Sequence, residues 1–386
     1  MNFYRVRQRF AAQKLNDVAR VVRAELIPFP IRAGSRIAIA VGSRGIANLP
    51  VIVREVVEWV REHDAEPFIV PAMGSHGGAT AEGQRKILEN YGIDSAPIES
   101  LMEVVQLGPD AFMDREAFQS DGVILINRIK PHTSFHGRYE SGLMKMIAIG
   151  LANDAGARAI HAGGVEALRD RIPAVARQII ATGKILFGVA IVENAYDETM
   201  VVRATCRIAE DEPALLELAR ANMPRLPVED IDVLIVDEIG KDISGTGMDT
   251  NVIGRMRIAG QSEPTSPRIK MIVVRDLSPG SGDSAYGIGL ADVTTRRLVE
   301  KTDWNVTNAN VAASGFTERG KLPHAAETDE EALEFALAGN TDARIVRIKN
   351  TLHLDTLLAS ESVLAEIQGR EVIEVLEPVA GLFTPF

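Results

Sequence analysis

The segment IAIAVGSRGIANLPVIVREVVEWV, residues 37–60, contains the pattern that most directly indicates the fold class. It opens with an apolar run of five residues, and a glycine-containing loop then separates this run from a helical pattern. Asn48 is placed to cap that helix, Pro50 suits its first turn, and four valines between residues 53 and 60 share one face. A continuous apolar strand followed by an amphipathic helix predicts a βαβ unit and a mostly parallel sheet.

The order of strand, glycine-rich loop and helix recurs along the chain. The same pattern predicts further strands at residues 67–70, 122–126, 233–236, 269–274 and 344–348. At roughly 150 residues per domain, 386 residues predict two or three domains. A proline-containing linker near residues 223–229 suggests where they divide. We therefore expect an α/β fold with an N-terminal α/β domain at 1–226, a C-terminal α/β domain at 227–370, and a tail, 371–386, that packs back on the first domain.

Composition limits the classes of function. Hydrophobic residues make up 46% of the chain and charged residues 25%, which is typical of a globular protein. The net charge of −11 argues against a nucleic-acid or anionic-membrane partner, although it leaves room for a local basic pocket. Cys206 is the single cysteine, which excludes an internal disulfide and a cysteine-based metal cluster. The sequence shows neither a secretory signal nor an apolar run of about 18 residues, so we expect a cytoplasmic protein.

Polar side chains follow several of the predicted strands. Arg44, His76, His132 and Lys241 each lie in a glycine- or proline-containing segment at a strand end. Ligands of open α/β sheets bind beyond the carboxyl ends of the strands. A single loop histidine is more often solvated than catalytic, but four such side chains at corresponding positions predict a binding site.

Four of the seven histidines, His76, His132, His136 and His161, lie within one region of the chain around Lys145. Lys145 stands in a segment apolar enough to be buried, where it could anchor a phosphate, act as a nucleophile or extend to the surface. Taken alone, the lysine favours the last of these. The spacing contains no HxH or HExxH motif, so it does not predict a conventional zinc site.

These motifs together resemble the nickel-pincer-nucleotide lactate racemases and their 2-hydroxyacid racemase and epimerase homologues, over most of the chain. The matching motifs are Gly74-Ser75-His76, Pro131-His132, Ser141-Gly142-Leu143-Met144-Lys145, His161 at 16 residues beyond that lysine, Arg44, and Gly240-Lys241-Asp242. The resemblance implies two α/β domains with the active site in the cleft between them. It also implies racemisation of a small lactate- or malate-like 2-hydroxy acid by reversible hydride transfer to a nickel-pincer nucleotide.

The resemblance implies a role for each matching residue. Lys145 would tether the pyridinium mononucleotide covalently, and His161 would bind both the cofactor and its nickel. His76 and His132 would act as the two catalytic bases, although His136 remains a competitor for the second role. Arg44 and Lys241 would bind the substrate. The partners implied are the 2-hydroxy acid and the proteins that assemble the nickel cofactor.

Several alternatives stay open. An NAD-dependent 2-hydroxyacid dehydrogenase would need a dinucleotide loop, and residues 280–287 match that motif weakly because its third glycine is missing. A non-catalytic protein that binds small carboxylates would need the cations but no histidine pair, and a histidine-based metallohydrolase lacks ligands at helical spacing. Arg128 and Lys130 could bind a second substrate carboxylate, but solvated loop charges are the favoured interpretation.

Overall fold

The computed structural model describes residues 1–42, 45–161 and 164–386. The chain divides into two compact units, each with its own sheet. We call residues 11–223 the N-terminal unit, and residues 1–10 together with 224–386 the C-terminal unit. The two sheets are mixed but mostly parallel, which confirms the α/β class predicted from the alternation of apolar strands and helices.

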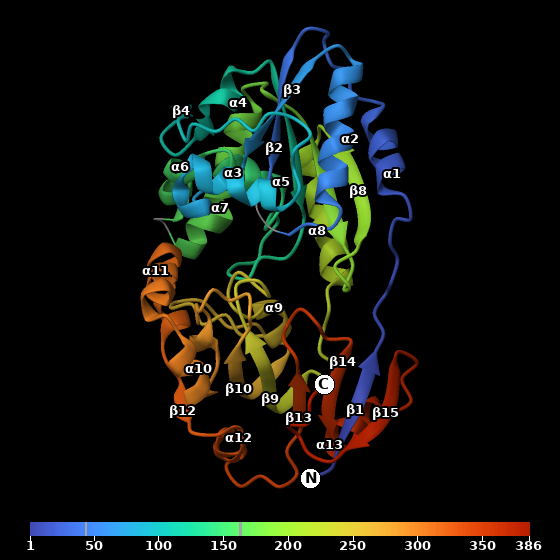
Figure 1. Cartoon of the computed structure of the whole chain (residues 1–386), viewed down its shortest axis with the longest axis vertical. Helices are drawn as coiled ribbons and strands as arrows, with labels where there is room; N and C mark the ends of the chain where they lie inside the picture. The colour runs from blue at the N-terminus through green and yellow to red at the C-terminus, as the bar shows by residue number, and fades with distance from the viewer. Residues whose placement is uncertain (43–44, 162–163) are drawn as a thin grey trace. The chain divides into compact units, whose positions relative to one another are not determined.

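The sheet of the N-terminal unit has the strand order β3-β2-β6-β7-β8 (Figure 1). Neighbouring strands run parallel except for the last pair, β7 and β8. The strands are β2 (Arg36–Val41), β3 (Glu66–Pro71), β6 (Gly122–Arg128), β7 (Ile185–Glu193) and β8 (Thr199–Thr205), and a small hairpin is formed by β4 (Val104–Gln106) and β5 (Phe112–Asp114).

Helices cover both faces of this sheet because its strands are apolar on both sides. Ile37, Ile39 and Val41 of β2 join one core, which includes α1 and α2, whereas Ala38 and Ala40 join the other, which includes α7 and α8. The helices are α1 (Val18–Leu26), α2 (Leu49–Glu62), η1 (Gly77–Ala79), α3 (Ala81–Asn90), α4 (Arg115–Gln119), α5 (Leu143–Lys145), η2 (Met146–Gly150), α6 (Asn153–His161), α7 (Gly164–Ile180) and α8 (Ile208–Asn222).

The sheet of the C-terminal unit has the order β12-β11-β10-β9-β13-β14-β1-β15. Its strands are β1 (Phe3–Gln8), β9 (Asp230–Ile239), β10 (Arg268–Leu277), β11 (Val293–Thr295), β12 (His324–Ala326), β13 (Ile345–Ile348), β14 (Thr356–Ser360) and β15 (Ile373–Val379). Its helices are α9 (Thr250–Ile253), η3 (Ile288–Leu290), α10 (Arg296–Lys301), α11 (Trp304–Ser314), η4 (Thr317–Gly320), α12 (Asp329–Leu337) and α13 (Glu361–Ile367).

The two ends of the chain meet in this sheet, which differs from the expected domain boundaries. β1, in blue in Figure 1, lies between the red strands β14 and β15 and pairs antiparallel with both. Phe3 and Val6 are buried there, so residues 3–8 form an integral strand of the sheet. Residues 1–10 therefore belong to the C-terminal unit, as do residues 371–386, which we expected to pack on the first domain.

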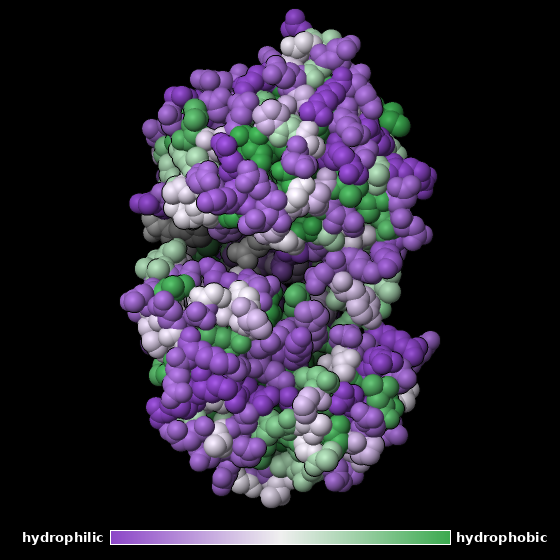
Figure 2. Space-filling view, in the orientation of Figure 1, coloured by the Kyte–Doolittle hydropathy of each residue, from purple (hydrophilic) through white to green (hydrophobic). Residues whose placement is uncertain are grey.

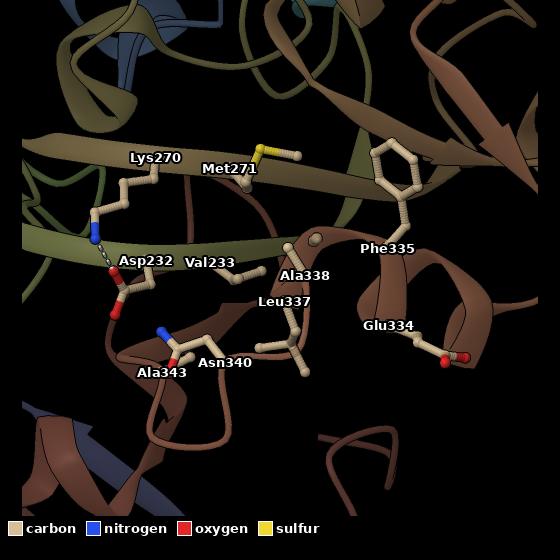
Figure 3. A pocket seen from close by; sticks show the side chains of 11 residues that line it. Asp232, Val233, Lys270, Met271, Glu334, Phe335, Leu337, Ala338, Asn340 and Ala343 are labelled. Carbon is tan, nitrogen blue, oxygen red and sulfur yellow. Dashed lines mark ion pairs between the residues drawn. The ribbon is translucent and has the colours of Figure 1, made fainter.

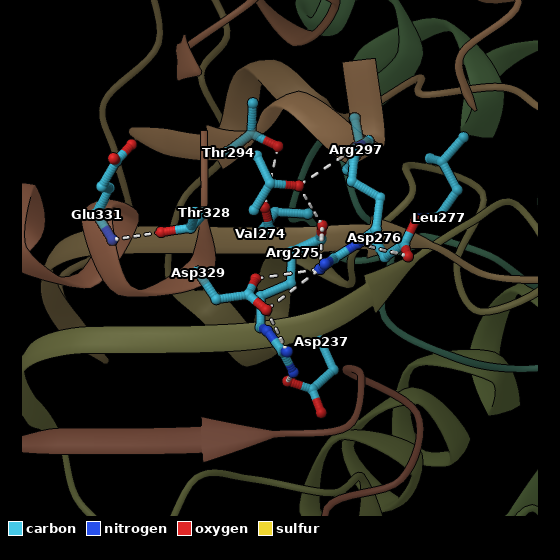
Figure 4. Close-up of polar contacts among 12 residues, drawn as sticks. Asp237, Val274, Arg275, Asp276, Leu277, Thr294, Arg297, Thr328, Asp329 and Glu331 are labelled. Carbon is cyan, nitrogen blue, oxygen red and sulfur yellow. Dashed lines mark hydrogen bonds and ion pairs between the residues drawn. The ribbon is translucent and has the colours of Figure 1, made fainter. Parts of the chain in front are cut away.

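A buried ion-pair network ties the C-terminal tail to this sheet. Asp237 accepts a bidentate pair of hydrogen bonds from Arg347, which is only 2% exposed, and a further bond from Arg275 at 2.8 Å. Arg275 also binds Asp329 of α12 at 2.6 Å (Figure 4). Because Arg347 donates to the backbone oxygens of Leu382 and Thr384 as well, the network fixes the last residues of the chain.

Most apolar side chains are enclosed in the cores of the two units. On the face shown in Figure 2, hydrophobic side chains appear in small groups scattered among hydrophilic ones. Among the helices in the described ranges, none is both long enough and apolar enough to cross a membrane.

Candidate active site

A cavity of about 180 Å³ lies at the carboxyl edge of the sheet of the N-terminal unit. Strands β2, β3 and β6 are parallel, so the loops that follow them all lie at this edge, where open α/β sheets bind ligands. The described lining includes the basic side chains of His76, Arg128, Lys130 and Lys145 but no acidic side chain. The composition of this cavity therefore favours an anionic ligand.

Lys145 is presented to the cavity by an irregular helix. The segment begins at Leu143 as α5 and widens at Met146–Gly150 into a π-turn, η2. Such turns are rare and often occur at functional sites. The half-buried Lys145 lines the cavity, and its Nζ lies 2.7 Å from Nε2 of His132.

The loop that carries His76 packs directly against this helix. The backbone N–H of Gly74 donates to the carbonyl oxygen of Gly150 at 3.2 Å. A Cβ atom on Gly150 would lie only 2.6 Å from the carbonyl oxygen of Ala72, so this approach requires glycine. His76, Lys145 and the π-turn consequently share one wall of the cavity.

A buried carboxylate organises the loop that carries His132. Glu140 is fully buried and accepts hydrogen bonds from the backbone N–H groups of His132 (2.6 Å) and Gly137 (3.1 Å). It also forms an ion pair with Arg220 at 2.7 Å. His136 is exposed, contacts Glu140 at 3.2 Å and is not among the residues that line the cavity, whereas His132 contacts Lys145.

The ring of His132 is oriented by two further contacts within its loop. The backbone N–H of Ser134 donates to Nδ1 at 3.0 Å, and the ring packs on Phe135 with the centroids 4.4 Å apart. Nδ1 is therefore a hydrogen-bond acceptor, and Nε2 is the nitrogen that faces Lys145.

A second buried carboxyl group, Glu212 of α8, holds the amino end of α5. It accepts a hydrogen bond from the backbone N–H of Met144 at 2.8 Å. Burial raises its pKa to about 8, and the backbone N–H groups of Leu143 and Met144 oppose this shift. A Cβ atom on Gly142 would lie 2.4 Å from Oε1 of Glu212, so the carboxyl group and the helix start are closely packed.

The remaining predicted residues fall in different places. Arg44 lies outside the described residues; the backbone of His161 ends α6, but its side chain also lies outside the described part of the chain. Lys241 belongs to the C-terminal unit, where its Nζ donates to Oδ1 of Asn310 at 2.6 Å. Arg128 forms an ion pair with the buried Glu193, so its charge is already balanced, while Lys130 lines the cavity.

Sequence reasoning missed both buried carboxylates. Glu212 precedes Pro213 and follows the acidic residues Glu210 and Asp211 in α8, so the local sequence gives no signal that this one carboxyl group is buried. Glu140 stands four residues after His136 and directly before the Ser141-Gly142 motif. That proximity to the predicted site was the one available signal.

A larger cavity, about 690 Å³, lies in the C-terminal unit (Figure 3). Its wall is largely apolar, with Met271 and Leu337, and its charged pair, Lys270 and Asp232, is joined at 2.5 Å. It lies at the amino ends of β9 and β10, the edge opposite to the one at which open α/β sheets bind their ligands. We therefore assign the candidate site to the smaller cavity.

The weak dinucleotide motif does not form the expected structure. Residues 280–287 follow β10, but the helix after them is η3, a single 3₁₀ turn at Ile288–Leu290. A dinucleotide loop needs the amino terminus of a full helix for the pyrophosphate. This part of the chain therefore does not support the dehydrogenase alternative.

Comparison with solved structures relates the fold to a known enzyme. The chain is similar to the lactate racemase apoprotein from Thermoanaerobacterium thermosaccharolyticum, with a TM-score of 0.54 over 90% of this chain and 94% of that one. The two sequences are 14% identical, so the similarity is one of fold. Neither the family models nor the curated proteins gave a match to this sequence.

Proposed function

We propose that the protein is a racemase or epimerase of a small 2-hydroxy acid that works with a nickel-pincer nucleotide. The observation that carries the proposal is the arrangement of His76, Lys145 and His132. His76 and Lys145 line one cavity whose described lining has no acidic side chain, and His132 contacts Lys145. The fold shared with a lactate racemase apoprotein supports the same conclusion.

The chemistry of the available side chains fits the cofactor. Among the described residues, no three histidine, cysteine or acidic side chains are grouped to hold a metal, so a metal bound here would take most of its donors from an organic group. Lys145 offers an amine for a covalent tether, and acylation would remove its charge and lower the cost of burial. His161 is the proposed nickel ligand. The bound cofactor would supply a two-electron acceptor for the hydrogen on the substrate α-carbon.

The side chains of this protein would handle the proton and the substrate charge. As the α-hydrogen leaves, the substrate hydroxyl must lose its proton, and the two enantiomers present that hydroxyl to opposite sides. His76 and His132 would serve as the two bases, because imidazole gives and accepts protons near neutral pH. Arg44 and Lys241 are proposed to bind the carboxylate and the hydroxyl or keto oxygen.

Polarimetry tests this function. Protein produced in a host that makes the nickel cofactor should abolish the optical rotation of an enantiopure 2-hydroxy acid such as lactate or malate. Nickel-loaded protein that binds these acids but leaves every rotation unchanged would instead be a carboxylate-binding protein. Reduction of NAD⁺ by the same acids would favour the dehydrogenase.

Matched histidine variants test the assigned bases. His76→Ala and His132→Ala should each lower the racemisation rate per bound nickel by about 10² to 10⁴-fold, the range expected for loss of a general base. His136→Ala is the control, because this exposed histidine lies in the same loop but contacts Glu140, whereas His132 contacts Lys145. Normal activity in either of the first two variants would remove that histidine from the mechanism.

A further inference from the structure

We propose that His132 holds Lys145 as an uncharged, nucleophilic amine in the protein before any cofactor is attached. Only the identity of the natural electrophile rests on the proposed function, because the argument itself concerns two hydrogen bonds. Both involve the ring of His132, one at each nitrogen.

The first hydrogen bond determines which ring nitrogen carries the hydrogen. The backbone N–H of Ser134 can only donate, so Nδ1 of His132, 3.0 Å away, must offer a lone pair. An imidazole whose Nδ1 bears a lone pair is neutral and carries its hydrogen on Nε2. Nε2 is therefore a donor.

The second hydrogen bond then determines the state of Lys145. Nε2 lies 2.7 Å from Nζ, within hydrogen-bonding distance. A donor at Nε2 needs an acceptor at Nζ, and an ammonium group has three hydrogens but no lone pair. The two bonds can form together only if Lys145 is the neutral amine.

The charged groups around Lys145 act in the same direction. Lys130 lines the same cavity, and a second positive charge at Lys145 would be repelled by it. Arg177 of the neighbouring α7 is also cationic and bonds to the hydroxyl of Tyr139.

The nearby carboxyl groups are engaged elsewhere. Glu193 is paired with Arg128, and Glu140 binds Arg220, His136 and the backbone of the His132 loop. Glu212 accepts from the backbone at the start of α5.

A neutral amine in a cationic cavity would react with an anionic carbonyl compound. With an activated acyl or thioacyl donor, Nζ forms a bond to the carbonyl carbon and the bond to the leaving group breaks. The leaving group departs with one Nζ hydrogen, so neither oxidant nor reductant is needed. The product nitrogen is an amide, which cannot accept a hydrogen bond from Nε2; attachment therefore releases His132 to serve the substrate hydroxyl.

Reductive labelling of the cofactor-free protein tests the proposal. Pyridoxal 5′-phosphate, an anionic aldehyde, condenses with the amine with loss of water, and cyanoborohydride reduces the imine to a stable adduct. Peptide mass spectrometry compares Lys145 with Lys86, an exposed lysine on α3. We expect Lys145 to react at least tenfold faster at pH 7. Its rate should change little from pH 7 to 9, while that of Lys86 rises about tenfold per pH unit as its amine deprotonates.

Variants separate the role of His132 from general accessibility. His132→Gln should lower the labelling rate of Lys145 at pH 7 by at least tenfold and make its pH dependence match that of Lys86. His136→Gln should leave the labelling rate of Lys145 and its pH dependence unchanged. Equal rates and equal pH profiles for Lys145 and Lys86 in the unaltered protein would overturn the proposal, and so would an unchanged profile in His132→Gln. A reactive Lys145 in a protein that never racemises a 2-hydroxy acid would refute the proposed function and leave this inference standing.

Discussion

The carboxyl group of Glu212 is the most perturbed acid near the candidate site. Its pKa rises from an ordinary 4.5 to about 8 because the side chain is buried at the start of α5. The folded state therefore keeps a proton that the unfolded chain releases above pH 4.5. This stabilising contribution is complete below pH 4.5 and is lost as the pH rises through 8.

Glu212→Gln should remove this part of the pH dependence. Glutamine keeps an oxygen for the N–H of Met144 but does not ionise. The unfolding free energy of the unaltered protein should fall by on the order of 4 kcal/mol more than that of the variant between pH 5 and pH 9. Urea unfolding at a series of pH values measures the difference, and parallel curves would contradict the assignment.

Asp237 should be indispensable to the buried network of the C-terminal unit. Asp237→Asn would leave Arg347 and Arg275 adjacent without their shared carboxylate, at an expected cost of about 3–5 kcal/mol. Asp230→Asn, on the same strand but in an exposed pair with Arg268, should cost less than about 1 kcal/mol. Equal urea-unfolding midpoints for the two variants would show that burial does not matter here.

At the level of single residues, the sequence predicted side chains that line the cavity, but not the buried carboxyl groups that hold the surrounding loops and helices in place. His76 was identified because it follows a strand end, and Lys145 because its motif resembles that of a known family; the structure brings both to one cavity. Glu212 was not, because its burial depends on α8 packing over a helix start almost 70 residues earlier in the chain. Such tertiary contacts leave no periodic trace in the sequence.

At the level of elements, the π-turn at Met146–Gly150 is the feature that joins the His76 loop to the Lys145 helix. The turn follows α5 and precedes α6 and α7. The widened turn was not expected, because hydrophobic periodicity does not distinguish an α-turn from a π-turn.

Gly150→Ala tests how tightly the turn is packed. The new Cβ atom would lie 2.6 Å from a backbone oxygen, so the His76 loop must move, at an expected cost of about 1–3 kcal/mol. Gly45→Ala is the matched control, since a Cβ there meets nothing within 4 Å. Urea unfolding should separate the two variants, and an unaffected Gly150→Ala protein would show that the loop can shift without strain.

At the level of the whole molecule, the chain forms two units whose boundary is not a single point in the sequence. The linker near residues 223–229 was located from composition, and the units do divide at residue 223. The return of the first ten residues to the C-terminal unit was missed. Pairing between residues 3–8 and strands beyond residue 355 is too distant in the sequence for any local pattern to reveal.

Removal of residues 1–8 should damage one unit only. β14 and β15 would lose the strand between them, whereas β2, β3 and β6 have no pairing with β1. Hydrogen–deuterium exchange should show faster exchange in β14 and β15 and unchanged protection in β2, β3 and β6. Uniformly faster exchange would mean that the units unfold together.

The position of β1 also has a consequence for synthesis on the ribosome. Its residues emerge before residues 11–223, and the strands on either side of it emerge after them, so β1 cannot pair with β14 and β15 until those strands have been synthesised. The intervening residues 11–223 form a contiguous unit that can fold in the meantime. The sheet of the C-terminal unit can therefore close around β1 only after β14 and β15 have left the ribosome, more than 300 residues after β1 itself.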